Sequence, residues 1–169
     1  MTSTRRLSVR SFVLVCLYAL AALASACAEG APTGPGGSQP LPFHGSLEAI
    51  DTDSLAFPFL SVHLAGGGTA THIGAYKAVF DFKINLQTPE VPAAGTFTMT
   101  AANGDTIVGN LSGRAQIADG IATVVESMTI TGGTGRFAGA AGSFTVQRTA
   151  NQATGATQGS FDGTLTLRN

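Results

Sequence analysis

Charged residues are scarce in this 169-residue chain, and tryptophan is missing altogether. Only 11% of the residues are charged, and lysine and glutamate are rare, a composition that disfavours long surface helices. Three of the nine basic residues lie within the first ten positions, so the chain from Cys27 onward has six basic and ten acidic residues and a net charge of −4. Without a basic patch, nucleic acid is excluded as an expected partner.

Cysteine and clustered metal ligands are also in short supply. Cys16 lies inside an N-terminal leader, which leaves Cys27 as the single thiol of the expected mature chain and excludes an intrachain disulfide. The three histidines are far apart and the carboxylates are not clustered, so we expect no metal site and no cofactor. No serine stands in a nucleophile elbow either.

Residues 1–26 have the pattern of a signal peptide. A basic n-region precedes an apolar run from Phe12 to Ala24, which is too short to span a bilayer and ends in the small-residue sequence ASA. The sequence LASAC, which ends at Cys27, resembles a bacterial lipobox, in which the cysteine becomes the lipidated N-terminus. We therefore expect export to the cell envelope, with membrane contact through the lipid anchor only. Plain secretion after an ordinary cleavage site is the alternative.

Residues 27–42 are expected to link this anchor to a folded domain. After the lipid-attachment residue Cys27, the sequence AEGAPTGPGGSQPLP is rich in glycine and proline and almost free of large apolar side chains. Such a composition is typical of a flexible tether. The domain itself is expected at 43–169, a length sufficient for one core and too short for two ordinary domains.

The domain is expected to be all-β. Apolar and polar residues alternate in several stretches, as where Phe97 and Met99 share a face opposite Thr98. Asn103 and Gly104 suit a type I′ hairpin turn, because both residues accept a positive φ. The expected strands are His44–Ile50, Phe59–Ala65, Thr71–Leu86, Gly95–Ala101, Thr106–Ser112, Ala122–Thr131, Ser143–Thr149 and Gly159–Leu167.

Eight strands with one buried face each fit an antiparallel eight-stranded barrel or, as the alternative, a two-sheet β-sandwich. The stretch Thr71–Leu86 favours the barrel, because it is very long for a sandwich strand and a tilted barrel strand bent at Gly74 accommodates it better.

The glycine-rich stretch TITGGTGRFAGAAGSF, residues 129–144, is expected to be a shaped crossing between two strands. Replacing Gly132, Gly133 or Gly135 by a β-branched residue is expected to cost stability. Within the stretch, Arg136 is a candidate to meet an acidic ligand group at the barrel mouth; the alternative is a pair with a surface carboxylate.

GGTGRFAGAAG, together with the AANGDT hairpin before it, resembles the glycine-rich segment of dirigent proteins and their relatives in the allene oxide cyclase barrel superfamily. The likeness covers about Thr69 to Leu167. It implies an eight-stranded antiparallel barrel with an apolar cavity, often assembled as a homotrimer. Known activities of that superfamily steer the cyclisation or coupling of reactive organic intermediates, but its functional residues have no individual matches here.

Three polar residues stand on apolar faces of the expected strands. His72 and Tyr76 share a face with phenylalanines of the third strand, and Glu126 shares one with Val124 and Met128 of the sixth. If these faces point inward, the three residues line the barrel interior as candidate acid or base groups. The alternative is that they hydrogen-bond one another and stabilise the barrel end.

Two functions remain open on sequence alone. The first is a non-enzymatic exported barrel that binds a small apolar ligand or serves as a structural module. The second is an isomerase or cyclase-like enzyme that uses Glu126, His72 and Tyr76. A barrel filled by its phenylalanines favours the first, and an open pocket with Glu126 at its base favours the second.

Overall fold

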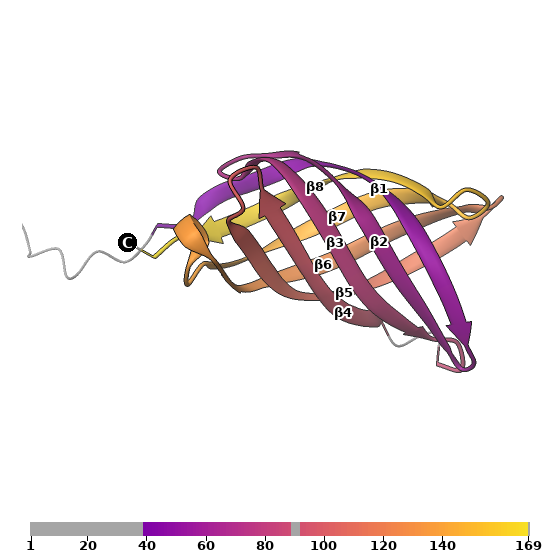
Figure 1. Ribbon diagram of the computed structural model, residues 1–169. Helices are drawn as coiled ribbons and strands as arrows, with labels where there is room; N and C mark the ends of the chain where they lie inside the picture. Colours follow the sequence, from indigo (N-terminus) through magenta and orange to yellow (C-terminus); the bar gives the residue numbers. More distant parts are fainter. Residues whose placement is uncertain (1–38, 89–91, 169) are drawn as a thin grey trace, which may run out of the picture. The chain divides into compact units, whose positions relative to one another are not determined.

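A computed structural model describes residues 39–88 and 92–168. These residues form a closed barrel of eight antiparallel strands, each hydrogen-bonded to its neighbours in chain order (Figure 1). The expected signal peptide and Cys27 lie outside the described residues. The elements are β1 (Leu41–Ala56), β2 (Phe59–Ala70), β3 (Gly74–Asn85), β4 (Ala93–Ala101), β5 (Thr106–Ala118), β6 (Ile121–Gly133), the 3₁₀ turn η1 (Gly135–Phe137), β7 (Ala141–Asn151) and β8 (Ala156–Thr166).

The barrel closes because the first strand pairs with the last. β1 and β8 are antiparallel partners from Leu41 opposite Leu165 to Ile50 opposite Ala156. A sandwich would instead leave free edges on two separate sheets. The eight-stranded barrel is therefore confirmed, and the sandwich alternative is excluded. In the described part of the chain, no helix has the length and hydropathy needed to cross a membrane.

The expected boundaries were wrong for most strands, β2 and β5 for example extending to Ala70 and Ala118, and two differences bear on the fold argument. Residues 71–73 form the turn between β2 and β3, so β3 begins at Gly74 and spans 12 residues rather than 16. The 16-residue strand is β1, which begins at Leu41 and thus takes in the last two residues of the expected tether. The argument from strand length therefore led to the right fold through the wrong strand.

The barrel has two ends, which we call the closed end and the open end and which carry different connections. The closed end carries the β2–β3 and β4–β5 turns and η1, which Figure 1 shows beside the marked C-terminus. The open end carries the β1–β2, β3–β4, β5–β6 and β7–β8 connections. Phe137 of η1 is 1% exposed and belongs to the main core cluster, so the side chain of this short turn is part of the packed interior.

Aromatic side chains fill much of the barrel interior. The rings of Phe43, Phe144 and Phe161 are in mutual contact, with centroids 4.9 to 5.3 Å apart. Phe97 extends the cluster at 5.4 Å from Phe144. These separations and tilted geometries are those that aromatic pairs favour, and they add to the stabilisation from apolar burial. This part of the barrel has a packed core.

Glycines on neighbouring strands make room for the large interior side chains. A Cβ added at Gly113 would lie 2.5 Å from Cγ of Glu126, and one added at Gly159 would lie 2.6 Å from Cβ of Arg148. Each of these glycines faces its large neighbour across a strand pair. The same relation holds for Gly95 with Phe82 and for Gly163 with Phe144.

The glycine-rich segment, residues 129–144, forms a tightly turned connection between β6 and β7, as its sequence indicates. Gly135 and Gly139 have φ values of 56° and 69°, which other residues rarely adopt. A Cβ on Gly133 would overlap the carbonyl oxygen of Thr106. Gly132 is different, since a Cβ there would have nothing within 4 Å. Gly132 therefore has neither the positive φ nor the close packing on which the expected loss of stability rested.

Candidate functional site

A cluster of charged side chains lies inside the barrel, on the face that is otherwise apolar. Arg148 of β7 donates from Nε to Oε2 of Glu126 at 3.0 Å and from Nη2 to Oε1 at 2.9 Å. Glu126 and Arg148 are 1% and 4% exposed. This is a two-pronged guanidinium–carboxylate pair, the geometry in which such hydrogen bonds are strongest.

Two further residues complete the cluster. Nη1 of Arg148 donates to Oδ2 of Asp51 on β1 and to Oγ1 of Thr157 on β8, both at 3.1 Å. The Thr157 hydroxyl in turn donates to the carbonyl oxygen of Thr149 at 2.9 Å. The guanidinium therefore joins side chains from four neighbouring strands, β6, β7, β8 and β1.

Burial and neighbouring charges shift the pKa values of Arg148 and Asp51. Burial alone would lower the pKa of Arg148, but the hydrogen bonds and charges of Glu126 and Asp51 raise it, so the guanidinium stays charged. For Asp51, burial raises the pKa more than the nearby Arg148 lowers it. Its Oδ1 atom is buried and has no hydrogen-bond partner within residues 39–88 and 92–168.

A cavity of about 110 Å³ lies beside this cluster towards the open end. Most of its lining is apolar and comes from β2, β3, β4, β5 and β6, whereas the charged cluster contributes the polar side. Arg114 and Asp53, both exposed, are also among its lining residues. The main lining residues are Leu60, Val62, Phe82, Ile84, Ala93, Ala122 and Val124, with Asp51, Glu126 and Arg148.

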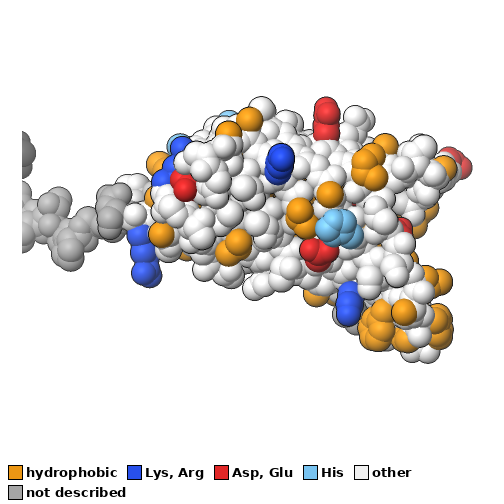
Figure 2. Space-filling model, viewed as in Figure 1, with side chains coloured by type: hydrophobic (Ala, Val, Ile, Leu, Met, Phe, Trp, Pro, Cys, Tyr) orange, Lys and Arg blue, Asp and Glu red, His pale blue; other side chains and the backbone are white. Residues whose placement is uncertain are grey.

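The open end is apolar on its outside as well. Leu55 and Phe57, at the tip of the β1–β2 hairpin, are 63% and 72% exposed, and Phe59 and Leu86 are also exposed. Figure 2 shows hydrophobic side chains gathered over one projecting corner of the barrel.

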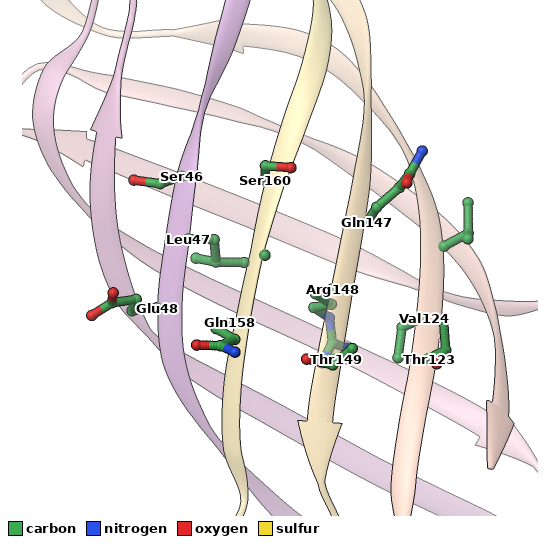
Figure 3. Close-up of a pocket in the computed structure, with 12 residues that line it drawn as sticks. Ser46, Leu47, Glu48, Thr123, Val124, Gln147, Arg148, Thr149, Gln158 and Ser160 are labelled. Carbon is green, nitrogen blue, oxygen red and sulfur yellow. The ribbon is translucent and has the colours of Figure 1, made fainter. Parts of the chain in front are cut away.

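A larger hollow of about 610 Å³ lies on the outer wall over β1, β6, β7 and β8. Figure 3 shows its residues spread across neighbouring strands, with Glu48, Gln147 and Gln158 among them. These side chains are exposed and point away from the core. We place the site at the interior cavity, because within residues 39–88 and 92–168 it is there that buried charged groups converge beside an apolar lining.

The structure separates the three residues expected to line one interior site. Glu126 is buried in the polar cluster. Tyr76 is buried elsewhere, with its ring 6.4 Å from Phe161 and its hydroxyl donating to the carbonyl oxygen of Ser46 at 2.6 Å, and burial raises its pKa. His72 is exposed in the β2–β3 turn with a φ of 62°, so its placement in the interior was wrong.

Arg136 lies at the closed end, away from the cavity. Its Nη2 donates to the carbonyl oxygen of Ile73 at 3.1 Å, and its Nε is 3.8 Å from Oδ2 of Asp105. Its side chain is half-exposed. Of the two alternatives for this residue, the structure shows the pair with a carboxylate.

Sequence reasoning missed the partners of Glu126. Arg148 continues the inward period of Phe144 and Val146, and Asp51 continues that of Leu47 and Ala49. Extending each alternation by one step would have placed both charged residues inside. The expected network of His72, Tyr76 and Glu126 is replaced by one of Glu126, Arg148, Asp51 and Thr157.

Two comparisons with known proteins gave no match. No family model matches the chain, and no curated protein matches it. The resemblance to the allene oxide cyclase barrel superfamily therefore stays a prediction, as does the homotrimer that it implies.

Proposed function

We propose that this barrel binds a small, largely apolar molecule in the cavity at its open end. The observation that carries the proposal is the cavity itself, in which apolar side chains of five strands face a fixed set of buried charged groups. Ligand sites commonly combine an apolar lining with a few well-placed polar groups. The volume of about 110 Å³ is of the same order as the roughly 150 Å³ of a protein cavity known to hold benzene, so a ligand here is about the size of a single small aromatic ring.

The geometry favours binding over an isomerase or cyclase-like reaction at Glu126. Both carboxylate oxygens of Glu126 already accept hydrogen bonds from Arg148. A general acid or base needs an oxygen that can reach a substrate proton. The reaction would also need His72 or Tyr76 beside Glu126. His72 is exposed in a turn, and the Tyr76 hydroxyl is bonded to the main chain elsewhere, so neither can act together with Glu126.

The proposal includes the location of the protein in the cell. The signal-peptide pattern of residues 1–26 and the lipobox-like sequence at Cys27 support an exported barrel held at a membrane by a lipid. The glycine-rich tether would connect this anchor to β1. A barrel that captures small apolar molecules at the cell envelope is the function that combines these features.

The test uses toluene as the probe and the barrel with a blocked cavity as the comparison. Ala115 lines the cavity and is exposed, so Ala115→Trp fills the mouth without overpacking the core. Ala102 is also exposed but lies in the β4–β5 turn at the closed end, which makes Ala102→Trp the matched control. Ligand-detected NMR should show toluene binding to the parent protein and to Ala102→Trp, and loss of binding in Ala115→Trp.

The same experiment examines Arg136. Arg136→Ala should bind toluene as the parent does, because the residue is at the closed end. Absence of toluene binding to the folded parent protein, or equal binding to both tryptophan variants, would refute the proposed site.

A further inference from the structure

The charged groups around the cavity do not balance. Its lining contains three acidic residues, Asp51, Asp53 and Glu126, and two basic residues, Arg114 and Arg148. Arg114 is exposed on β5, so Arg148 is the only buried cation among the described lining residues. The polar side of the cavity therefore has an excess of negative charge.

Arg148 has little capacity left to hold an anion. It makes four hydrogen bonds, two to Glu126, one to Asp51 and one to Thr157, and a guanidinium has five N–H donors in all. An anionic ligand would have to displace a carboxylate from this pair. It would also approach Asp51 and Glu126, which repel it.

The Asp51 carboxylate, in contrast, lacks a hydrogen-bond donor. Only Oδ2 of its carboxylate is bonded, to Arg148, while the buried Oδ1 has no partner in the described chain. Burying an acceptor without a donor is unfavourable, more so when the acceptor is charged, so native structures seldom leave one unpaired. The raised pKa of Asp51 has the same origin, namely burial with incomplete compensation.

We propose that the ligand of this cavity is a small apolar molecule with a cationic amine, and that its ammonium group is bound by Asp51. An ammonium group offsets the excess negative charge and, once the Asp51 side chain turns Oδ1 towards the cavity, supplies the missing donor. The apolar portion lies against side chains such as Val62, Phe82 and Ile84. This inference rests on the proposed function, because it assumes that the cavity takes a ligand.

Three probes of similar size and different charge test the inference at neutral pH. Toluene is neutral, benzylamine is a cation and benzoate is an anion. In titrations followed by NMR, we expect benzylamine to bind the parent protein at least tenfold more tightly than toluene, and benzoate to bind more weakly than toluene. Asp51→Asn should remove most of the preference of benzylamine over toluene.

A matched variant separates the local effect from the overall charge. Asp162 is exposed on the outer side of β8, so Asp162→Asn removes one negative charge without touching the cavity and should keep the preference. If toluene binds and benzylamine binds no better, or if both variants keep the preference equally, the cationic ligand is refuted while the proposed function survives. If no probe binds to the folded protein, both are refuted.

Discussion

Glu126 and Arg148 meet diagonally across adjacent strands and join through two hydrogen bonds of 2.9 and 3.0 Å. The residue directly opposite Arg148 is Val124, and the one opposite Glu126 is Val146. Diagonal neighbours on one face of a sheet are within reach of long side chains. The pair is therefore a property of the register between β6 and β7, and a shift of one strand by one residue would turn its charge outward and leave the other charge inside without its partner.

Breaking this pair from one side should be costly. Arg148→Met leaves Glu126 and Asp51 buried without their cation, so we expect a loss of about 3 to 5 kcal/mol in the free energy of unfolding, measured with urea. The double variant Arg148→Met with Glu126→Leu should lose less than Arg148→Met alone, because one uncompensated charge is gone. Arg114→Met, on an exposed residue, is the control and should change stability by no more than about 0.5 kcal/mol.

If the double variant is as unstable as the sum of its two single variants, the two residues do not interact as described. Equal effects of Arg148→Met and Arg114→Met would likewise contradict the burial of Arg148.

Adjacent glycines at the end of β6 should respond differently to valine. Gly133→Val puts a Cβ against the carbonyl oxygen of Thr106 and should cost roughly 1 to 3 kcal/mol. Gly132→Val meets no atom within 4 Å and should stay within about 0.5 kcal/mol of the parent. Thermal unfolding of the two variants checks this order, and the reverse order would mean that the β6–η1 crossing is packed differently.

The stability of the protein should depend on the charge of Asp51. Its pKa in the folded state is raised above the ordinary value of 3.8 by burial, against the opposing effect of Arg148, with Asp53 and Glu126 adding to the rise. The folded state thus holds this proton more tightly than the unfolded state does. As the pH rises from about 3.8 through the raised pKa, the parent should lose stability relative to Asp51→Asn.

Urea unfolding of the parent and of Asp51→Asn, measured in parallel from pH 4 to pH 7, gives this difference directly. A difference that stays constant, or that moves in favour of the parent as the pH rises, would show that the Asp51 carboxyl is better compensated than its contacts indicate.

The proposed lipid anchor predicts where the protein is found. Cys27→Ser removes the thiol that would carry the lipid, so the protein should move from the membrane fraction to the soluble fraction. Cys16→Ser changes the other cysteine, inside the leader, and should leave the protein with the membrane. An unchanged distribution of Cys27→Ser between the fractions would favour plain secretion.

The sequence alone predicts the eight strands because each strand has one buried and one exposed face. Apolar and polar residues therefore alternate along the strand, and this alternation can be recognised in the sequence. The sequence predicts the β4–β5 hairpin for a different reason, since Gly104 has a φ of 89° that few residues accept. The expected type I′ turn was wrong, because Asn103 does not have the positive φ that this turn type requires. Strand ends are less visible. The turn at residues 71–73 changes the phase of the alternation, so Ile73 is buried and His72, which shares the parity of Tyr76, is not.

The candidate site was only partly predictable, because its contacts link distant parts of the chain. Asp51 and Arg148 are 97 residues apart and meet only because β1, β8 and β7 are neighbours in the closed barrel. A pattern within one strand can show that a charged residue faces inward. Which other charge it meets there depends on strand order and register, and neither is encoded locally.

The pairing of β1 with β8 also bears on how the chain folds. Every other strand pair joins consecutive segments, but this one joins segments at the two ends of the described sequence. Contacts so far apart are slow to form, because a long loop must close before they are made. Until β8 is in place, β1 and β7 both present free edges, the kind of surface on which strands of separate molecules associate. β8 therefore protects two edges at once, and we expect a chain that stops before Ala156 to associate with other copies through the edges of β1 and β7.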